Sequence, residues 1–312
     1  MTFQISGAHI PVAYLVGVGL VVGVLGGFFG VGGSFLVTPA LFGFGVPMNF
    51  VVGTDLMHVV GKSIVAARKH RQLGNIDLKL GFIMMAGTIP GVEAGAQLIE
   101  HLKRTSRVDM AVGITFVVFL VGMSFFMLWE GRRLLPIQWH RGAFVRRKPI
   151  SRAADKPTAS AGAIKWLQLS NLPPYVSLPS SGIKRISLWS IIGVSLLGGF
   201  LSGFLGGGAG YFRMPSMIYL LGIPTHTAVG TDLFEIIVSA GYGTVTHAVK
   251  GNVDALIALV MHTGAAIGAQ AGAIMTEFVN GPTLRVAFAP LLLVGAAIIL
   301  HSLFAGHPAG VR

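Results

Sequence analysis

Two Gly-Thr-Asp motifs hold the carboxylates with the clearest potential for chemistry. They read Gly53-Thr54-Asp55 and Gly230-Thr231-Asp232, and each follows a Gly-x-Pro turn by several residues. Hydroxyls, carboxylates and freed backbone can line a substrate or coupling-ion site, and an Asp removed from water can carry a proton. Helix capping is the structural alternative, because Thr and Asp in the first turn of a helix satisfy free N–H groups. The motifs alone leave both interpretations open.

Two glycine clusters precede these motifs and predict breaks in helices. They read Gly30-Val31-Gly32-Gly33 and Gly206-Gly207-Gly208-Ala209, and a proline follows each at Pro39 or Pro215. Glycine destabilises a helix by about 1 kcal/mol relative to alanine, so such clusters permit unwound backbone. Free N–H groups at the start of the next helix segment attract an anion. We therefore assign Gly30, Gly32, Gly33, Gly206, Gly207 and Gly208 to a substrate site.

Charged residues inside apolar segments add to the candidate site, since a charge in hydrocarbon is costly and usually functional. Lys62 and Arg213 are the cations suited to an anion, and Glu235 shares a helix face with Asp232. Pairing of Lys62 with Asp55 and of Arg213 with Asp232 is the structural alternative. The sequence thus predicts substrate binding by Thr54, Lys62, Arg213 and Thr231, and ion coupling by Asp55, Asp232 and Glu235. Further ionisable candidates are His58, Glu93, His226, His247 and His262.

Enzymatic and metal-dependent functions receive no support. The chain has no cysteine, no HExxH pair, no GxSxG and no carboxylate–histidine cluster. The run Val60-Gly61-Lys62-Ser63 imitates the end of a P-loop, but Leu56 stands where the motif requires glycine. We expect no enzyme activity, no cofactor and no metal site.

The elements that must position these residues are membrane helices. Apolar residues make up 53% of the 312 residues and charged residues only 11%, and no Asp, Glu, Lys or Arg precedes Asp55. Several uncharged runs exceed the roughly 20 residues that a helix needs to cross a bilayer, and they lack the alternation of a barrel strand. The sequence predicts an all-α polytopic protein of the cell inner membrane, without a cleavable signal peptide.

An internal repeat divides the chain into two halves. Residues 27–41 match 203–217 at a shift of 176, and from residue 45 onward the shift is 177. We therefore expect transmembrane repeats at 8–130 and 187–306, each with about five apolar segments. The second segment of each repeat is short, which is typical of broken helices near the membrane midplane. An odd number of crossings predicts an inverted repeat.

The net charge of +12 belongs mostly to the segment between the halves. Between Gly131 and Ser187 the chain has 11 basic residues against one acid, Asp155. We expect residues 131–186 to be a basic, Pro-containing cytoplasmic loop that contacts anionic lipid, in agreement with the bias of cytoplasmic loops toward Lys and Arg. Nucleic acid is not an expected partner.

The ordered motifs resemble one known family. The two glycine-rich stretches ahead of a proline, the repeated Gly-Thr-Asp motifs, and the loops Gly74-Asn75-Ile76-Asp77 and Gly251-Asn252-Val253-Asp254 are similar to the TauE/SafE family of sulfite and organosulfonate exporters. The resemblance covers both halves. It implies an inner-membrane permease for small sulfur-containing anions, an inverted repeat and a homodimer.

A secondary transporter is therefore the expected function, with an exporter coupled to an ion or proton as the favoured form. Two alternatives stay open from the sequence. One is an anion channel on the same scaffold, and the other is a membrane scaffold whose basic loop recruits a partner.

Overall fold

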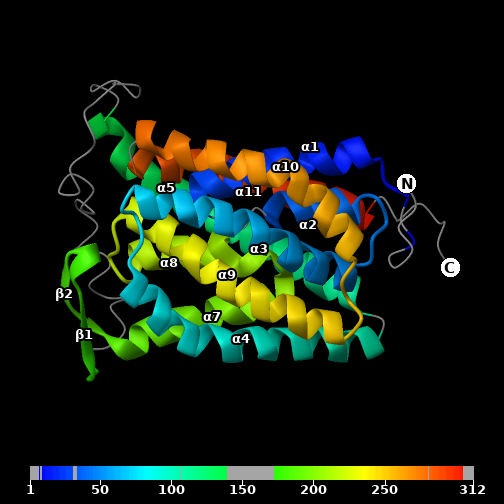
Figure 1. Cartoon of the computed structure of the whole chain (residues 1–312), viewed down its shortest axis with the longest axis horizontal. Coiled ribbons are helices and arrows are strands. Elements are labelled where there is room, and N and C mark those ends of the chain that lie inside the picture. Colours follow the sequence, from blue (N-terminus) through cyan, green and yellow to red (C-terminus); the bar gives the residue numbers. More distant parts are fainter. Residues whose placement is uncertain are drawn as a thin grey trace.

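The computed structural model describes residues 7, 9–30, 34–105, 107–138, 172–279 and 281–304, and these form an all-α protein (Figure 1). Ten α-helices lie within this part of the chain. Six helices are long and apolar enough to cross a membrane. The predicted all-α polytopic fold is confirmed.

The two halves contain matching sets of helices. The first half has α1 Val12–Phe29, α2 Ser34–Phe42, α3 Met48–Gln72, α4 Leu78–Arg104 and α5 Val108–Gln138. The second half has α7 Leu188–Leu205, α8 Gly210–Tyr219, α9 Thr225–Val249, α10 Ala255–Met275 and α11 Gly281–Phe304, with short 3-10 turns η4 Gly207–Ala209 and η5 Thr276–Phe278. A hairpin of β1 Tyr175–Leu178 and β2 Ile183–Ser187, with the 3-10 turn η3 Pro179–Ser181 between its strands, precedes α7.

Repeated turn residues set the helix starts in both halves. Pro47 and Pro224 occupy the positions before α3 and α9, where a proline suits the entry to a helix because it lacks an N–H. Asp77 and Asp254 cap α4 and α10, and their carboxylates accept the backbone N–H groups of Leu80 and Ile257. The same turn and capping residues therefore start the equivalent helices in both halves.

The helices pack chiefly across the halves rather than within them. Along the α1–α10 contact, Gly19, Gly23 and Gly27 lie successively against Met261, Ala265 and Ala269, so these two helices run parallel. The α4–α7 contact is built in the same way, and both pairs can be followed in Figure 1. Each half thus supplies one helix to each pair.

Regularly spaced glycines create these close contacts. A side chain at Gly268 would meet the backbone of Leu20 and Val24 on α1, with the Val24 nitrogen 2.8 Å from the Cβ position. Small residues allow helices to approach closely enough for dispersion to hold them together in lipid. The glycines of α4 meet the backbone of α7 in the same manner.

We expect Gly268→Ala to lower the thermal unfolding temperature by several degrees. The added methyl group would push α10 off α1, and overpacking of this kind costs about 1–3 kcal/mol. Gly193→Ala on α7 is the control, because no atom lies within 4 Å of its Cβ position. Thermal unfolding in detergent should separate the two, and equal unfolding temperatures would contradict the packing argument.

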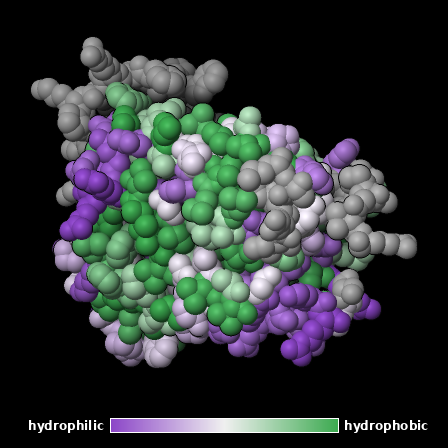
Figure 2. All heavy atoms as spheres, turned by 45° about the vertical axis from the view of Figure 1, so that its right-hand side comes forward, coloured by the Kyte–Doolittle hydropathy of each residue, from purple (hydrophilic) through white to green (hydrophobic). Residues whose placement is uncertain are grey.

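The outer surface suits lipid. In Figure 2, hydrophobic side chains cover the middle of the visible face, while hydrophilic side chains gather toward its edges. Large apolar side chains such as Met110, Val118 and Ile267 are exposed. An exposed surface of this kind is expected where hydrocarbon rather than water is the solvent.

The segment between the halves differs from expectation at both ends. Helix α5 continues to Gln138, eight residues past the predicted boundary, and the hairpin orders residues 175–187. Residues 139–171 lie outside the described part of the chain. The hairpin contacts the start of α4, because Ser181 Oγ donates to Asp77 Oδ2 at 2.6 Å and Lys79 Nζ donates to the Ser177 carbonyl at 2.8 Å.

Candidate functional site

The second glycine cluster breaks the helix between α7 and α8. Gly206, Gly207, Gly208 and Ala209 all have positive φ, at 85°, 63°, 76° and 52°. Glycine adopts this left-handed region without a steric penalty, whereas Ala209 is strained there. The predicted unwound backbone is therefore present at residues 206–209.

The first glycine cluster is described only at its beginning. Gly30 ends α1 with φ of 70°, as a left-handed C-cap. The other two predicted glycines of this cluster, Gly32 and Gly33, lie outside the described residues. Each described cluster packs on the opposite half, because Gly30 contacts Val229 of α9 and Gly206 lies beside Val52 of α3.

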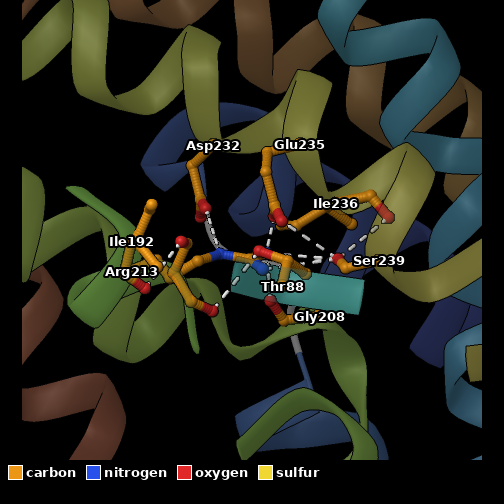
Figure 3. A network of polar contacts seen from close by, with 9 residues as sticks. Thr88, Ile192, Gly208, Arg213, Asp232, Glu235, Ile236 and Ser239 are labelled. Carbon is orange, nitrogen blue, oxygen red and sulfur yellow. Dashed lines mark hydrogen bonds and ion pairs between the residues drawn. The ribbon is translucent and has the colours of Figure 1, made fainter. Parts of the chain in front are cut away.

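Arg213 is the centre of a fully buried ionic network beside the break (Figure 3). Its Nε donates to Asp232 Oδ1 at 2.8 Å, and its Nη1 pairs with Glu235 Oε2. Its Nη2 donates to the Gly208 carbonyl, and Ser239 Oγ lies 3.4 Å from both terminal nitrogens. We call Arg213, Asp232, Glu235 and Ser239 the arginine cluster.

Neighbouring elements hold the arginine cluster in place. Gly198 of α7 leaves room for the aliphatic part of Arg213, since a Cβ there would overlap the Arg213 side chain. Thr88 of α4 hydrogen bonds with Glu235, so four helices and the break contribute to one network. The guanidinium joins the break to α9, because it contacts Gly208 and two carboxylates at once.

The charges of the arginine cluster do not balance. One guanidinium faces two carboxylates, and Asp232 Oδ2 and Glu235 Oε1 have no hydrogen-bond partner among the described residues. A buried excess negative charge is expensive, so two such carboxylates titrate as a pair that retains a proton. Arg213 is already neutralised by these carboxylates, and the coupling role of Asp232 and Glu235 stays a prediction.

A second buried cluster lies at the equivalent place in the first half. Asp55, His58 and Lys62 follow one face of α3, with side chains 0–2% exposed. His58 Nδ1 lies 3.7 Å from Asp55 Oδ1. We call these three residues the lysine cluster; they occupy the repeat positions of Asp232, Glu235 and Ser239.

The polar atoms of the lysine cluster are poorly satisfied. Both Asp55 oxygens, both His58 nitrogens and Lys62 Nζ have no hydrogen-bond partner among the described residues. Burying an ammonium without partners is costly, so Lys62 has unused capacity to bind an anion. Asp55 also lies beside the break of the other half, since its Oδ2 is 3.7 Å from the Cβ position of Gly206.

Tyr211 lies between the two clusters. This residue of α8 is 1% exposed, and its hydroxyl has no hydrogen-bond partner among the described residues. It interacts electrostatically with both Asp55 and Arg213. The two clusters are thus parts of one polar interior rather than separate sites.

The hydroxyl groups of Thr54 and Thr231 form hydrogen bonds that join the two halves. Thr54 Oγ1 accepts the backbone N–H of Asp254, and Thr231 Oγ1 accepts that of Asp77, each at 2.9 Å. These bonds link each Gly-Thr-Asp motif to the Gly-Asn-x-Asp loop of the other half. The capping alternative is wrong for these motifs, because α3 and α9 begin six residues before the threonines.

We expect Thr231→Val to lower stability by about 1–3 kcal/mol, because it leaves the buried N–H of Asp77 without its acceptor. Thr231→Ser keeps the oxygen and should retain most of the stability. Thermal unfolding of the purified variants would measure the difference. A valine variant as stable as the serine variant would show that the bond between the halves is unimportant.

The chain matches one protein family over most of its length. The family model described as "Sulfite exporter TauE/SafE" matches residues 15–299. The chain belongs to the TauE/SafE family. Its members matched here are membrane transporters rather than enzymes, and the chain is a multi-pass membrane protein.

Curated TauE/SafE relatives share modest identity over nearly the whole chain. The probable membrane transporter protein YunE of Bacillus subtilis is 25% identical over 299 residues, which cover 93% of this chain and 98% of that protein. The probable membrane transporter protein YjnA of the same organism is 26% identical, over 88% of this chain and 94% of that protein. No solved structure gives a significant match.

Some residues of this TauE/SafE site escaped the sequence analysis. Ser239 and Thr88 carry no motif, whereas Gly208 was among the predicted residues and contacts Arg213 through its carbonyl. The repeat supplies a signal for Ser239, since it stands at the position of Lys62. Nothing in the sequence indicates Thr88, which reaches the site only because α4 packs against α7 and α9.

Proposed function

We propose that this chain is a secondary transporter that exports small sulfur-containing anions such as sulfite or organosulfonates, coupled to the movement of a proton. Membership of the TauE/SafE family supports transport, and the two buried clusters support the division of roles within it. The lysine cluster binds the anion, and the arginine cluster carries the proton.

The proposal rests on the different surroundings of the two buried cations, Arg213 and Lys62. Arg213 is surrounded by carboxylates, a hydroxyl and a carbonyl, whereas Lys62 Nζ has no hydrogen-bond partner among the described residues. Asp55 interacts electrostatically with Lys62 but accepts no hydrogen bond from it, so an anion gains most from Lys62, the cation whose N–H donors are unused. Arg213 therefore belongs to the coupling site rather than to the substrate site, and Lys62 remains the anion ligand.

Coupling follows from the shared interior. An anion at Lys62 adds negative charge near Asp55, which interacts electrostatically with Tyr211, and Tyr211 interacts with Arg213. Additional negative charge favours protonation of nearby carboxylates. Anion binding and proton uptake at Asp232 and Glu235 therefore assist each other.

An inverted repeat provides the alternating access. The Gly27 carbonyl near the end of α1 accepts a hydrogen bond from His70 Nε2 at the end of α3. Helices α1 and α3 therefore run the same way, and α4 turns back after α3. Because α10 runs parallel to α1, α4 and α10 run in opposite directions. Rocking of such halves about the breaks would expose the site to each side in turn.

Two partner proposals accompany this function. We propose a homodimer, on the strength of the family resemblance, and contact of the basic segment 131–186 with anionic lipid. The mass of the purified protein in a lipid nanodisc tests the first, and binding of a peptide of residues 139–171 to anionic and neutral vesicles tests the second.

Flux in proteoliposomes tests the transport proposal. Labelled sulfite should enter liposomes that contain the protein at rates typical of a carrier and should respond to a pH gradient. Currents far above carrier turnover without proton dependence would favour the channel alternative. Absence of any sulfite or sulfonate flux would contradict the proposal.

A deletion separates transport from the scaffold alternative. Removing residues 143–170 spares α5, the hairpin and both clusters. A transporter should retain its flux in this variant. Loss of cellular function with intact flux would instead assign the function to the basic segment.

A further inference from the structure

A carboxylate on α4 collects polar side chains from α9. Tyr242, Thr246 and Lys250 follow one face of α9 and its C-cap at intervals of four residues. Tyr242 and Thr246 donate to Glu93 Oε2 at 3.1 and 3.4 Å, and Lys250 Nζ lies 3.7 Å from Glu93 Oε1. Gln97 adds a bond to Glu93 from within α4 at 3.1 Å. We call Glu93, Tyr242, Thr246 and Lys250 the Glu93 network; it joins a helix of the first half to a helix of the second.

A second set of bonds holds the turn between α9 and α10 to the first half. Lys103, near the end of α4, donates to Asn252 Oδ1 at 3.0 Å and to the Lys250 carbonyl at 3.3 Å. Asn49, at the start of α3, donates to the same Asn252 oxygen at 2.9 Å. This turn lies at the end of the helices opposite the β1–β2 hairpin (Figure 1). Two helices of the first half therefore hold the second half at this end.

An apolar contact closes the seam next to these bonds. A Cβ at Gly243 of α9 would come within 2.9 Å of Leu56 Cδ1 on α3 and 3.2 Å of Val92 Cγ1 on α4, so the three helices meet there. Val92 precedes Glu93, and Leu56 follows Asp55 of the lysine cluster. The seam is therefore closed at the depth of the lysine cluster. Separation of α4 from α9 at this seam would break every bond that α9 makes to Glu93.

The repeat shows that the Glu93 network has no carboxylate counterpart at the hairpin end. The equivalent positions on α10 and α3 hold Gln270, Val65, Lys69 and Leu73. Valine and leucine side chains cannot donate a hydrogen bond. Lys69 pairs instead with Glu277, at 3.7 Å. The α3–α10 seam thus lacks the charged acceptor that ties α4 to α9.

We propose that the Glu93 network is a latch that holds the transporter closed at the end opposite the hairpin, so that the hairpin end opens more readily. Glu93 and Lys250 attract each other more strongly beside hydrocarbon than in water, because the effective dielectric constant is lower there. The inference rests on the alternating access of the proposed function and deepens it, because it names the residues that decide which end opens by preference.

Labelling of a buried cysteine from each face tests the latch. The chain has no cysteine, and Ser202→Cys places a thiol at a fully buried position of α7, four residues before Gly206. Glu93→Gln/Lys250→Leu copies the residues of the other seam. In right-side-out and inverted vesicles, it should raise labelling by a membrane-impermeant thiol reagent about tenfold, the factor for one lost bond to a charged group, and only from the face opposite the hairpin. An unchanged rate from that face would overturn the latch.

The repeat supplies the matched variants. Leu73→Lys/Gln270→Glu installs network residues in the α3–α10 seam and should slow labelling of Ser202→Cys from the hairpin face. Lys250→Arg keeps a cationic donor and should label like the parent protein. General loosening of the fold would instead raise labelling from both faces in Glu93→Gln/Lys250→Leu, and that result would also overturn the latch.

The labelling needs no substrate, so its outcome is separate from that of the transport measurement. One-sided labelling in a protein that moves no sulfite would refute the proposed transport alone. Normal sulfite flux with unchanged labelling in Glu93→Gln/Lys250→Leu would refute the latch alone.

Discussion

Arg213→Met should destabilise the protein by about 3–5 kcal/mol, the usual cost of removing one partner from a buried ion pair. The substitution leaves Asp232 and Glu235 fully buried without a cation, and both must then take up protons. Thermal unfolding and the yield of monodisperse protein in detergent measure the effect. Most of the loss arises from the stranded carboxylates rather than from lost packing.

The matched control neutralises the whole network. In Arg213→Met/Asp232→Asn/Glu235→Gln no charge remains to be stranded, so we expect this triple variant to be more stable than the single variant. Arg213→Lys keeps the charge but loses the planar fork that reaches both carboxylates, and should lie between them. If Arg213→Met unfolds like the wild-type protein, the arginine cluster is not the buried ionic network described here.

Lys62→Met should reduce anion flux by about 100-fold, which corresponds to about 3 kcal/mol for a lost charged contact with the substrate. Its effect on stability should be smaller than that of Arg213→Met, because Lys62 Nζ has no hydrogen-bond partner among the described residues. Proteoliposome flux at several sulfite concentrations, together with thermal unfolding, measures both effects.

Two variants control for position and charge. Lys62→Arg retains the cation and should keep part of the flux. Ser239→Ala alters the equivalent position of α9 without removing a charge, and should cost far less flux than Lys62→Met. A Lys62→Met variant that transports at the wild-type rate would exclude Lys62 as the anion ligand.

Composition and repeats were sufficient to predict much of the fold. Uncharged runs long enough to span a bilayer predict helices, because backbone groups in hydrocarbon must bond within the segment. The glycine cluster at residues 206–209 predicts its own break, since four residues with positive φ cannot continue a helix.

The sequence alone could not show which groups the buried charged residues contact. Whether Arg213 faces Asp232 or a substrate depends on the rotation of α8 relative to α9, which the packing around Gly198 decides. The capping alternative for Thr54 and Thr231 failed because the helices start earlier than the motif suggests, directly after Pro47 and Pro224. Their bonds to Asp254 and Asp77 span about 200 and 154 residues and leave no local signal.

Helix α5 extends beyond residue 130, where the first repeat was expected to end. The last turns of α5 include Arg132 and Arg133, and the helix ends at Gln138. Helical hydrogen bonding continues beyond the hydrocarbon, because basic side chains are stable at the membrane surface.

Simultaneous measurement of proton and sulfite movement in proteoliposomes tests the central claim most directly, namely that Lys62 binds the anion while Asp232 and Glu235 carry the proton. The wild-type protein should move protons in a fixed ratio to sulfite. Lys62→Met should lose both movements, whereas Glu235→Gln should keep sulfite exchange and lose its dependence on the pH gradient. Sulfite flux in Glu235→Gln that still follows the pH gradient, or wild-type sulfite flux in Lys62→Met, would contradict the account.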